Sequence, residues 1–135
     1  MEPRSVEELM ELLYASRYGP ALRTAALLRR ARPADKELQV AGLVSGLGPL
    51  LAPGDRAGQA DAAARAVRPL LGERVGRLVR GQPGDGGPLG DDDLLRLRQA
   101  AEEGAVTACD AGVLEDWRTV LELVAARNSR LGAVD

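Results

Sequence analysis

Histidine and cysteine, the side chains most used in metal and nucleophilic chemistry, are almost absent from this chain of 135 residues. It contains no histidine and one cysteine, Cys109. A metal site built on imidazole ligands is therefore excluded, and a Cys109 nucleophile would lack the histidine that usually acts as its base. We interpret Cys109 as a free thiol in a short loop, with a nucleophile as the alternative.

The acidic residues offer no evident catalytic pair. Glu102 precedes Glu103 and Glu115 precedes Asp116, but adjacent residues of a helix point in different directions. We interpret both pairs as parts of solvated helix faces. The stretch GQPGDGG at 81–87 has the glycines of a phosphate-binding loop, but it lacks the Lys and the Ser or Thr that such loops use. Neither feature predicts a catalytic site.

Charge and composition argue against nucleic acid as a partner. The formal net charge is −2, and the chain has one Trp, two Tyr and no Phe on which bases could stack. All 18 basic residues except Lys36 are arginine. The cluster Arg29, Arg30 and Arg32 is either a basic patch or a solvated helix end, where the dipole favours cations. We expect no nucleic-acid binding.

The sequence also predicts a cytoplasmic protein without membrane contact. No stretch approaches the roughly 18 apolar residues that a membrane helix requires. The N-terminus, MEPRSVEELMELL, is acidic and amphipathic, unlike a signal peptide. A single cysteine fits a reducing compartment.

Helical periodicity runs through the whole chain, and no segment alternates with the period of a strand. Residues 1–135 therefore predict one all-α domain, a compact bundle of about six or seven helices. Ser5 and Glu8 have the spacing of a capping box. Asp35 caps a helix that is apolar nearly all round, which places that helix at the centre of the bundle. Trp117 stands in the apolar stripe of the last helix and should be buried.

The remaining boundaries follow from glycine, proline and aspartate. Further helices are expected over 59–71 and 73–80, and the stretch at 46–49 should loosen or break the helix before it. Residues 81–93 are rich in Gly, Pro and Asp and predict a mobile loop. The aspartates at its end would cap the next helix, which should reach about residue 103.

Four segments together resemble a known family. They are ALRTAALLRRA at 21–31, QVAGLVSGLGPLL at 39–51, AARAVRPLLGERVGRLVR at 63–80, and the helix around 114–124. Their order and spacing over residues 17–124 are similar to a bacterial HD-domain subgroup related to mixed-valence di-iron oxygenases and to phosphohydrolases. The resemblance implies a helical bundle with a metal site at its centre.

Every position where that family carries a metal ligand holds a different residue here. The resemblance therefore implies a degenerate HD domain with no cofactor, because no metal could polarise a substrate or lower the pKa of a bound water. The replacing residues are Pro20, Ser45, Gly46, Pro49, Gln59, Gln82 and, beside Glu102, Ala101.

The vacated metal site would leave a pocket in the middle of the bundle. Ser45, Gln59 and Gln82 are expected to line it, with Arg23 or Glu102 at its mouth. Buried polar groups of this kind need partners, because each costs roughly 1–3 kcal/mol when unpaired. The alternative is that Gln59 and Gln82 lie on solvent-facing edges.

Two functions of different classes follow from these expectations. The first is a metal-independent protein that binds a small organic molecule, or a tailoring enzyme of bacterial secondary metabolism that cyclises or rearranges its substrate by orienting it. The second is a non-catalytic pseudoenzyme that binds or regulates a protein partner. A deep polar pocket favours the first, and a filled core with an exposed apolar patch favours the second. The alanines Ala62, Ala63 and Ala66 also predict close helix contacts across the two-fold axis of a homodimer.

Overall fold

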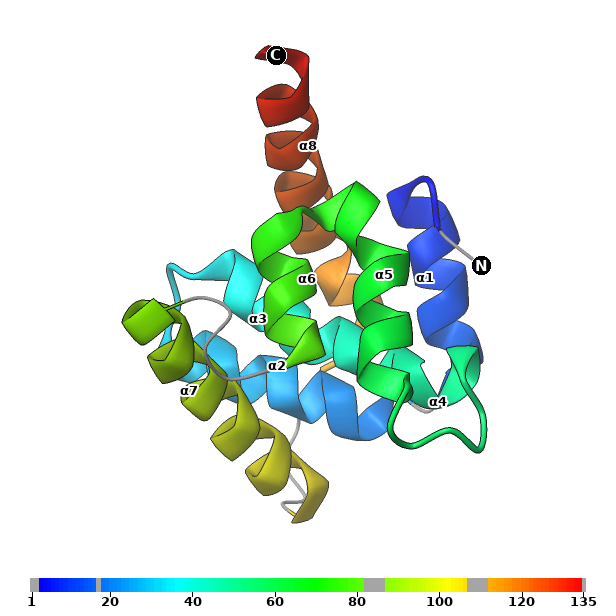
Figure 1. Ribbon diagram of the computed structural model, residues 1–135, viewed down its shortest axis with the longest axis vertical. Coiled ribbons are helices and arrows are strands. Elements are labelled where there is room, and N and C mark those ends of the chain that lie inside the picture. Colours follow the sequence, from blue (N-terminus) through cyan, green and yellow to red (C-terminus); the bar gives the residue numbers. More distant parts are fainter. Residues whose placement is uncertain (1–2, 17, 82–86, 107–111, 135) are drawn as a thin grey trace.

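The computed structural model describes residues 3–16, 18–81, 87–106 and 112–134. Within these ranges the chain forms seven helices longer than one turn, one single-turn helix and two 3-10 turns, without a strand (Figure 1). The prediction of an all-α bundle is confirmed. The elements are α1 (Val6–Ala15), α2 (Gly19–Ala31), α3 (Lys36–Val44), η1 (Ser45–Leu47), α4 (Gly48–Leu51), α5 (Gln59–Leu71), α6 (Glu73–Arg80), α7 (Gly87–Val106), η2 (Leu114–Trp117) and α8 (Arg118–Val134).

Local sequence signals set several helix boundaries. The Ser5 hydroxyl oxygen accepts a hydrogen bond from the backbone N–H of Glu8 at 3.2 Å. Asp35 caps α3 in the same way, accepting from the N–H of Leu38 at 3.1 Å. Gly72 separates α5 from α6 with a φ of 105°, which favours glycine. The predicted bounds of α5 and α6 are confirmed.

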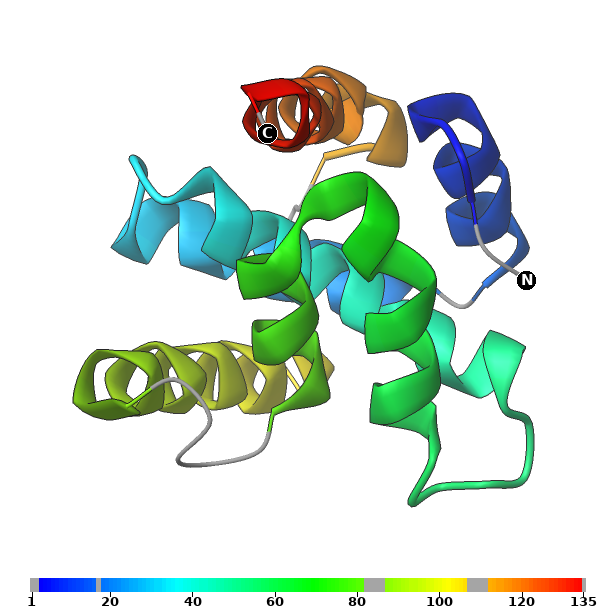
Figure 2. The same ribbon diagram turned by 45° about the horizontal axis from the view of Figure 1, so that its top comes forward.

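Helix α3 lies at the centre of the bundle, as predicted. Its residues from Leu38 to Val44 are all buried, and it packs against α2, α6, α7 and α8. Figure 2 shows α3 (cyan) between α8 above it and α7 below it. Trp117 is 1% exposed, and the guanidinium of Arg29 lies 4.6 Å from the centre of its ring. The prediction that Trp117 is buried is confirmed.

The α-helical conformation of α3 ends at Val44, as expected from the glycines and Pro49 that follow it, but the chain stays helical beyond this point. It continues through η1 into the single turn α4, which packs against the start of α5. A Cβ atom on Gly48 would lie 2.9 Å from both the Cβ and the carbonyl oxygen of Gln59. Glycine at this position therefore lets α4 approach α5 closely.

Helix α7 begins earlier than predicted. It starts at Gly87, so Asp92 and Asp93 lie within the helix rather than before it. Pro88 near the helix start is compatible with this boundary, because the first helical N–H groups have no partner within the helix. Of the predicted mobile loop, residues 82–86 lie outside the described residues, as does Cys109.

Candidate functional site

Arg23 lies where α2 meets the end of α7. Its Nε donates a hydrogen bond to the carbonyl oxygen of Gly104 at 2.6 Å. A Cβ on Gly104 would lie 3.0 Å from the backbone nitrogen of Thr24 and 3.3 Å from the carbonyl oxygen of Pro20. Glu102, the other residue expected at the pocket mouth, is exposed. The two helices are therefore in backbone contact beside Arg23.

Ser45 and Gln59 both bond to nearby backbone. Ser45 is exposed, and its hydroxyl donates to the carbonyl oxygen of Gly42 at 2.7 Å. Gln59 is half-buried, and its Nε2 donates to the carbonyl oxygen of Ala52 at 3.3 Å. Gln82 lies outside the described residues, so the pocket formed by all three side chains stays a prediction.

The interior described by the structure is aliphatic apart from Trp117 and Met10, and its buried polar side chains are paired. Among the described residues, Thr24 and Gln39 are the buried polar side chains. The Thr24 hydroxyl donates to the carbonyl oxygen of Pro20 at 2.9 Å. The Gln39 Nε2 donates to the carbonyl oxygens of Arg32 at 2.8 Å and Pro33 at 3.2 Å. No buried side-chain nitrogen or oxygen in the described part of the chain lacks a partner.

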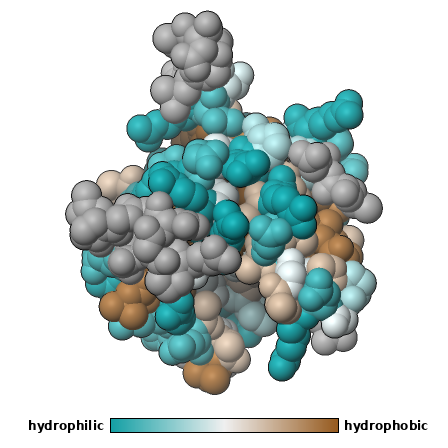
Figure 3. Space-filling model, viewed as in Figure 1, coloured by the Kyte–Doolittle hydropathy of each residue, from teal (hydrophilic) through white to brown (hydrophobic). Residues whose placement is uncertain are grey.

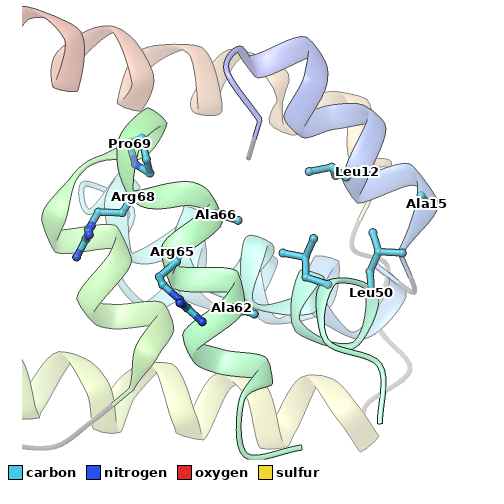
Figure 4. Close-up of a pocket in the computed structure, with 9 residues that line it drawn as sticks. Leu12, Ala15, Leu50, Ala62, Arg65, Ala66, Arg68 and Pro69 are labelled. Carbon is cyan, nitrogen blue, oxygen red and sulfur yellow. The ribbon is translucent and has the colours of Figure 1, made fainter. Parts of the chain in front are cut away.

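A surface groove of about 780 Å³ runs between α1, α4 and α5. Figure 4 shows Leu12 of α1 and Leu50 of α4 extending into the space beside α5. In Figure 3, hydrophobic surface over α1 and α4 borders hydrophilic surface over α5. The groove is lined by Leu12, Ala15, Leu50, Leu51, Ala62, Arg65, Ala66, Arg68 and Pro69.

Two glutamates of α1 lie beside the groove, although they are not among the residues that line it. Glu8 precedes Leu12 by four residues, and Glu11 precedes Ala15 by four, so each glutamate lies one turn from a groove residue on the same helix stripe. Both glutamates are exposed. We call Glu8 and Glu11 the acidic bank.

The opposite bank, on α5, is basic. Arg65 and Arg68 line the groove, and we call them the basic bank. Arg65 pairs with Asp61 at 3.0 Å and Arg68 with Glu73 at 3.9 Å, both between exposed side chains. Such surface pairs are weak, about 0–1 kcal/mol, so both guanidinium groups can exchange their present partners for others.

Part of this groove coincides with the alanines expected at the interface of a homodimer. Ala62, Ala63 and Ala66 were expected to form a helix contact between two copies. In the structure Ala63 and Ala66 are 0% and 3% exposed within one chain, while Ala62 is half-buried at the groove. The groove itself had no sequence signal, because its two sides come from helices that are far apart in the chain.

The described residues contain neither a metal-binding cluster nor a membrane-spanning helix. Within the described ranges, no group of three or more carboxylate or thiol side chains is placed to hold a metal ion. No helix in the described part of the chain is long and apolar enough to span a bilayer.

Comparison with models of protein families, with curated proteins and with solved structures gives no match to this chain. The resemblance to a degenerate HD domain therefore stays a prediction. The fold and the site define an all-α bundle with a paired interior and an open, aliphatic groove between banks of opposite charge.

Proposed function

We propose that this protein is a non-catalytic binding protein, and that the groove between α1, α4 and α5 receives a protein partner. The observation that carries the proposal is the aliphatic floor of this groove, where Leu50 remains 37% exposed. Exposed apolar surface bordered by charges is typical of protein interaction sites. This is the second of the two functions expected from the sequence.

The dimensions of the groove fit a short structural element of a partner. On α5 the floor extends from Ala62 to Pro69, which at 1.5 Å per residue is about 10 Å, or two helical turns. A partner helix placed along this floor could insert side chains at positions i, i+3 or i+4, and i+7. Alanines on the floor leave room for such side chains.

A small organic molecule is the second candidate ligand. The groove volume of about 780 Å³ falls within the range of small-molecule pockets. This candidate keeps the first expected function, a metal-independent binding protein or tailoring enzyme. The polar side chains that would orient a substrate there are Arg65 and Arg68.

Site-specific photo-crosslinking in the cells that make the protein distinguishes a protein partner from a small-molecule ligand. We expect a photoreactive amino acid in place of Leu50 to form a covalent adduct with a protein, and Leu12→Glu to abolish the adduct. The matched control is the same photoreactive residue in place of Leu95, which is 52% exposed on α7 away from the groove. Absence of a protein adduct at position 50, together with a small molecule retained in native mass spectrometry and lost in Leu50→Glu, would favour the second candidate and reject the first.

A further inference from the structure

We infer that the partner is an amphipathic α-helix with an aliphatic stripe, an acidic row along one side of it and a basic row along the other. Arg65 and Arg68 of α5 line the groove. On the other side, the exposed Glu8 and Glu11 lie one helical turn from the groove residues of α1, so the two sides carry opposite charges. A helix lying between them presents one flank to each bank. Because this helix would occupy the groove assigned above to a protein partner, the inference rests on the proposed function.

The opposite charges of the banks select against helices of a single sign. An acidic amphipathic helix would pair with the basic bank and be repelled by the acidic bank. A basic helix would pair with the acidic bank and be repelled by the basic bank. A helix with one flank of each sign satisfies both banks. Reversing the direction of such a helix exchanges its flanks, so the banks also select one of two orientations in the groove.

A second copy of this chain is the competing occupant. It would match the charges, because a two-fold axis along the groove brings each acidic bank onto the other copy's basic bank. It would not match the shape, because a two-fold contact between identical patches sets one hollow against another. A single convex helix fills the hollow, which is why we assign the groove to a helix.

The test uses three designed helical peptides with the same leucine stripe and two charged rows. The mixed peptide has one acidic and one basic row, and the other two have rows of a single sign. Their dissociation constants are measured by fluorescence anisotropy at low salt. We expect the mixed peptide to bind about tenfold more tightly than either of the others, since several surface ion pairs of less than about 1 kcal/mol each are exchanged for repulsions. The difference should shrink at about 1 M salt.

Charge reversal of one bank gives the sharper result. The double variant Glu8→Arg with Glu11→Arg makes both banks basic, and its preference should move from the mixed to the all-acidic peptide. Ala62→Glu and Leu12→Glu should each weaken the binding of all three peptides at least about tenfold. Circular dichroism of each variant checks that the helices of the protein remain folded. Leu95→Glu, an exposed leucine outside the groove, is the control and should leave binding unchanged.

The outcomes separate this inference from the proposed function. Equal binding of the three peptides, or a preference that the double variant does not move, would overturn the charge selection while leaving groove binding intact. No peptide binding alongside a protein adduct at position 50 would reject the helix but keep a protein partner. A two-chain mass in light scattering that reverts to one chain in Leu12→Glu would assign the groove to a second copy instead.

Discussion

Arg74 is the residue with the densest set of charged contacts among the described side chains. From α6 its two terminal nitrogens each lie 2.8 Å from a carboxylate oxygen of Asp35, at the start of α3. The same guanidinium lies 3.1 Å from Glu37 and 3.0 Å from Asp93 of α7. Hydrogen bonding to Asp35 raises the already high pKa of Arg74. One side chain thus joins three helices.

Replacement of Arg74 should destabilise the fold. Arg74→Met removes the cation and leaves Asp35, Glu37 and Asp93 facing one another, so we expect a loss of about 2–3 kcal/mol in the free energy of unfolding. Urea unfolding followed by circular dichroism measures it. Arg77→Met changes an exposed arginine on the same helix and should cost less than about 0.5 kcal/mol. Equal effects of the two variants would contradict the structural role of Arg74.

The same contact predicts sensitivity to acid. The hydrogen bond from Arg74 lowers the pKa of Asp35 below its ordinary value of 3.8. The unfolded chain therefore binds a proton at Asp35 before the folded chain does, so the stabilisation is complete above about pH 4 and is lost as the pH falls below it. Unfolding free energies measured from pH 6 down to pH 3 should fall more steeply for the native chain than for Arg74→Met. Parallel curves would exclude Asp35 as the cause.

At the scale of elements, the packing of α7 on α2 depends on Gly104. Alanine favours a helix over glycine by about 1 kcal/mol, but the new Cβ would lie 3.0 Å from the backbone nitrogen of Thr24 and 3.3 Å from the carbonyl oxygen of Pro20. Backbone atoms cannot rotate away, so overpacking of about 1–3 kcal/mol should outweigh the propensity.

We therefore expect Gly104→Ala to lower the midpoint of thermal unfolding by several degrees. Gly19→Ala is the matched control, because its Cβ would meet only Arg23, at 3.9 Å. Gly19→Ala should leave the midpoint within about two degrees of the native chain. A stabilised Gly104→Ala protein would mean that α7 does not pack against α2 so closely in solution.

Helix boundaries illustrate which elements could be predicted from the sequence. The caps Ser5 and Asp35 act on N–H groups three residues away, and Gly72 ends α5 through its own φ. Because these signals are local, the helix boundaries that they set could be predicted correctly. The start of α7 was not, because the aspartates that suggested a cap instead contact arginines of other helices: Asp92 and Asp93 both pair with Arg32.

At the scale of the whole molecule, the residue types predict that the purified protein holds no stoichiometric iron, manganese or zinc. The chain has no histidine and one thiol, and a site built from carboxylates alone has no suitable group among the described residues. Elemental analysis of protein purified without added chelator measures the metal content. One or two equivalents of any of the three metals per chain would contradict this prediction.

The sequence by itself determined the all-α class, the central position of α3, the burial of Trp117 and the lack of histidine chemistry. These properties depend on residue type, on periodicity within one helix and on caps a few residues away. Tertiary structure alone decided the groove, since Leu12 and Ala62 belong to helices separated by about a third of the chain and their spacing depends on the packing of every helix between them. It also decided that Ser45 is exposed and bonds to the end of the preceding helix α3, because the direction of a side chain at a helix end depends on the turn that follows. Position in the sequence specifies the neighbours of a residue along the chain, and only packing specifies what faces it across space.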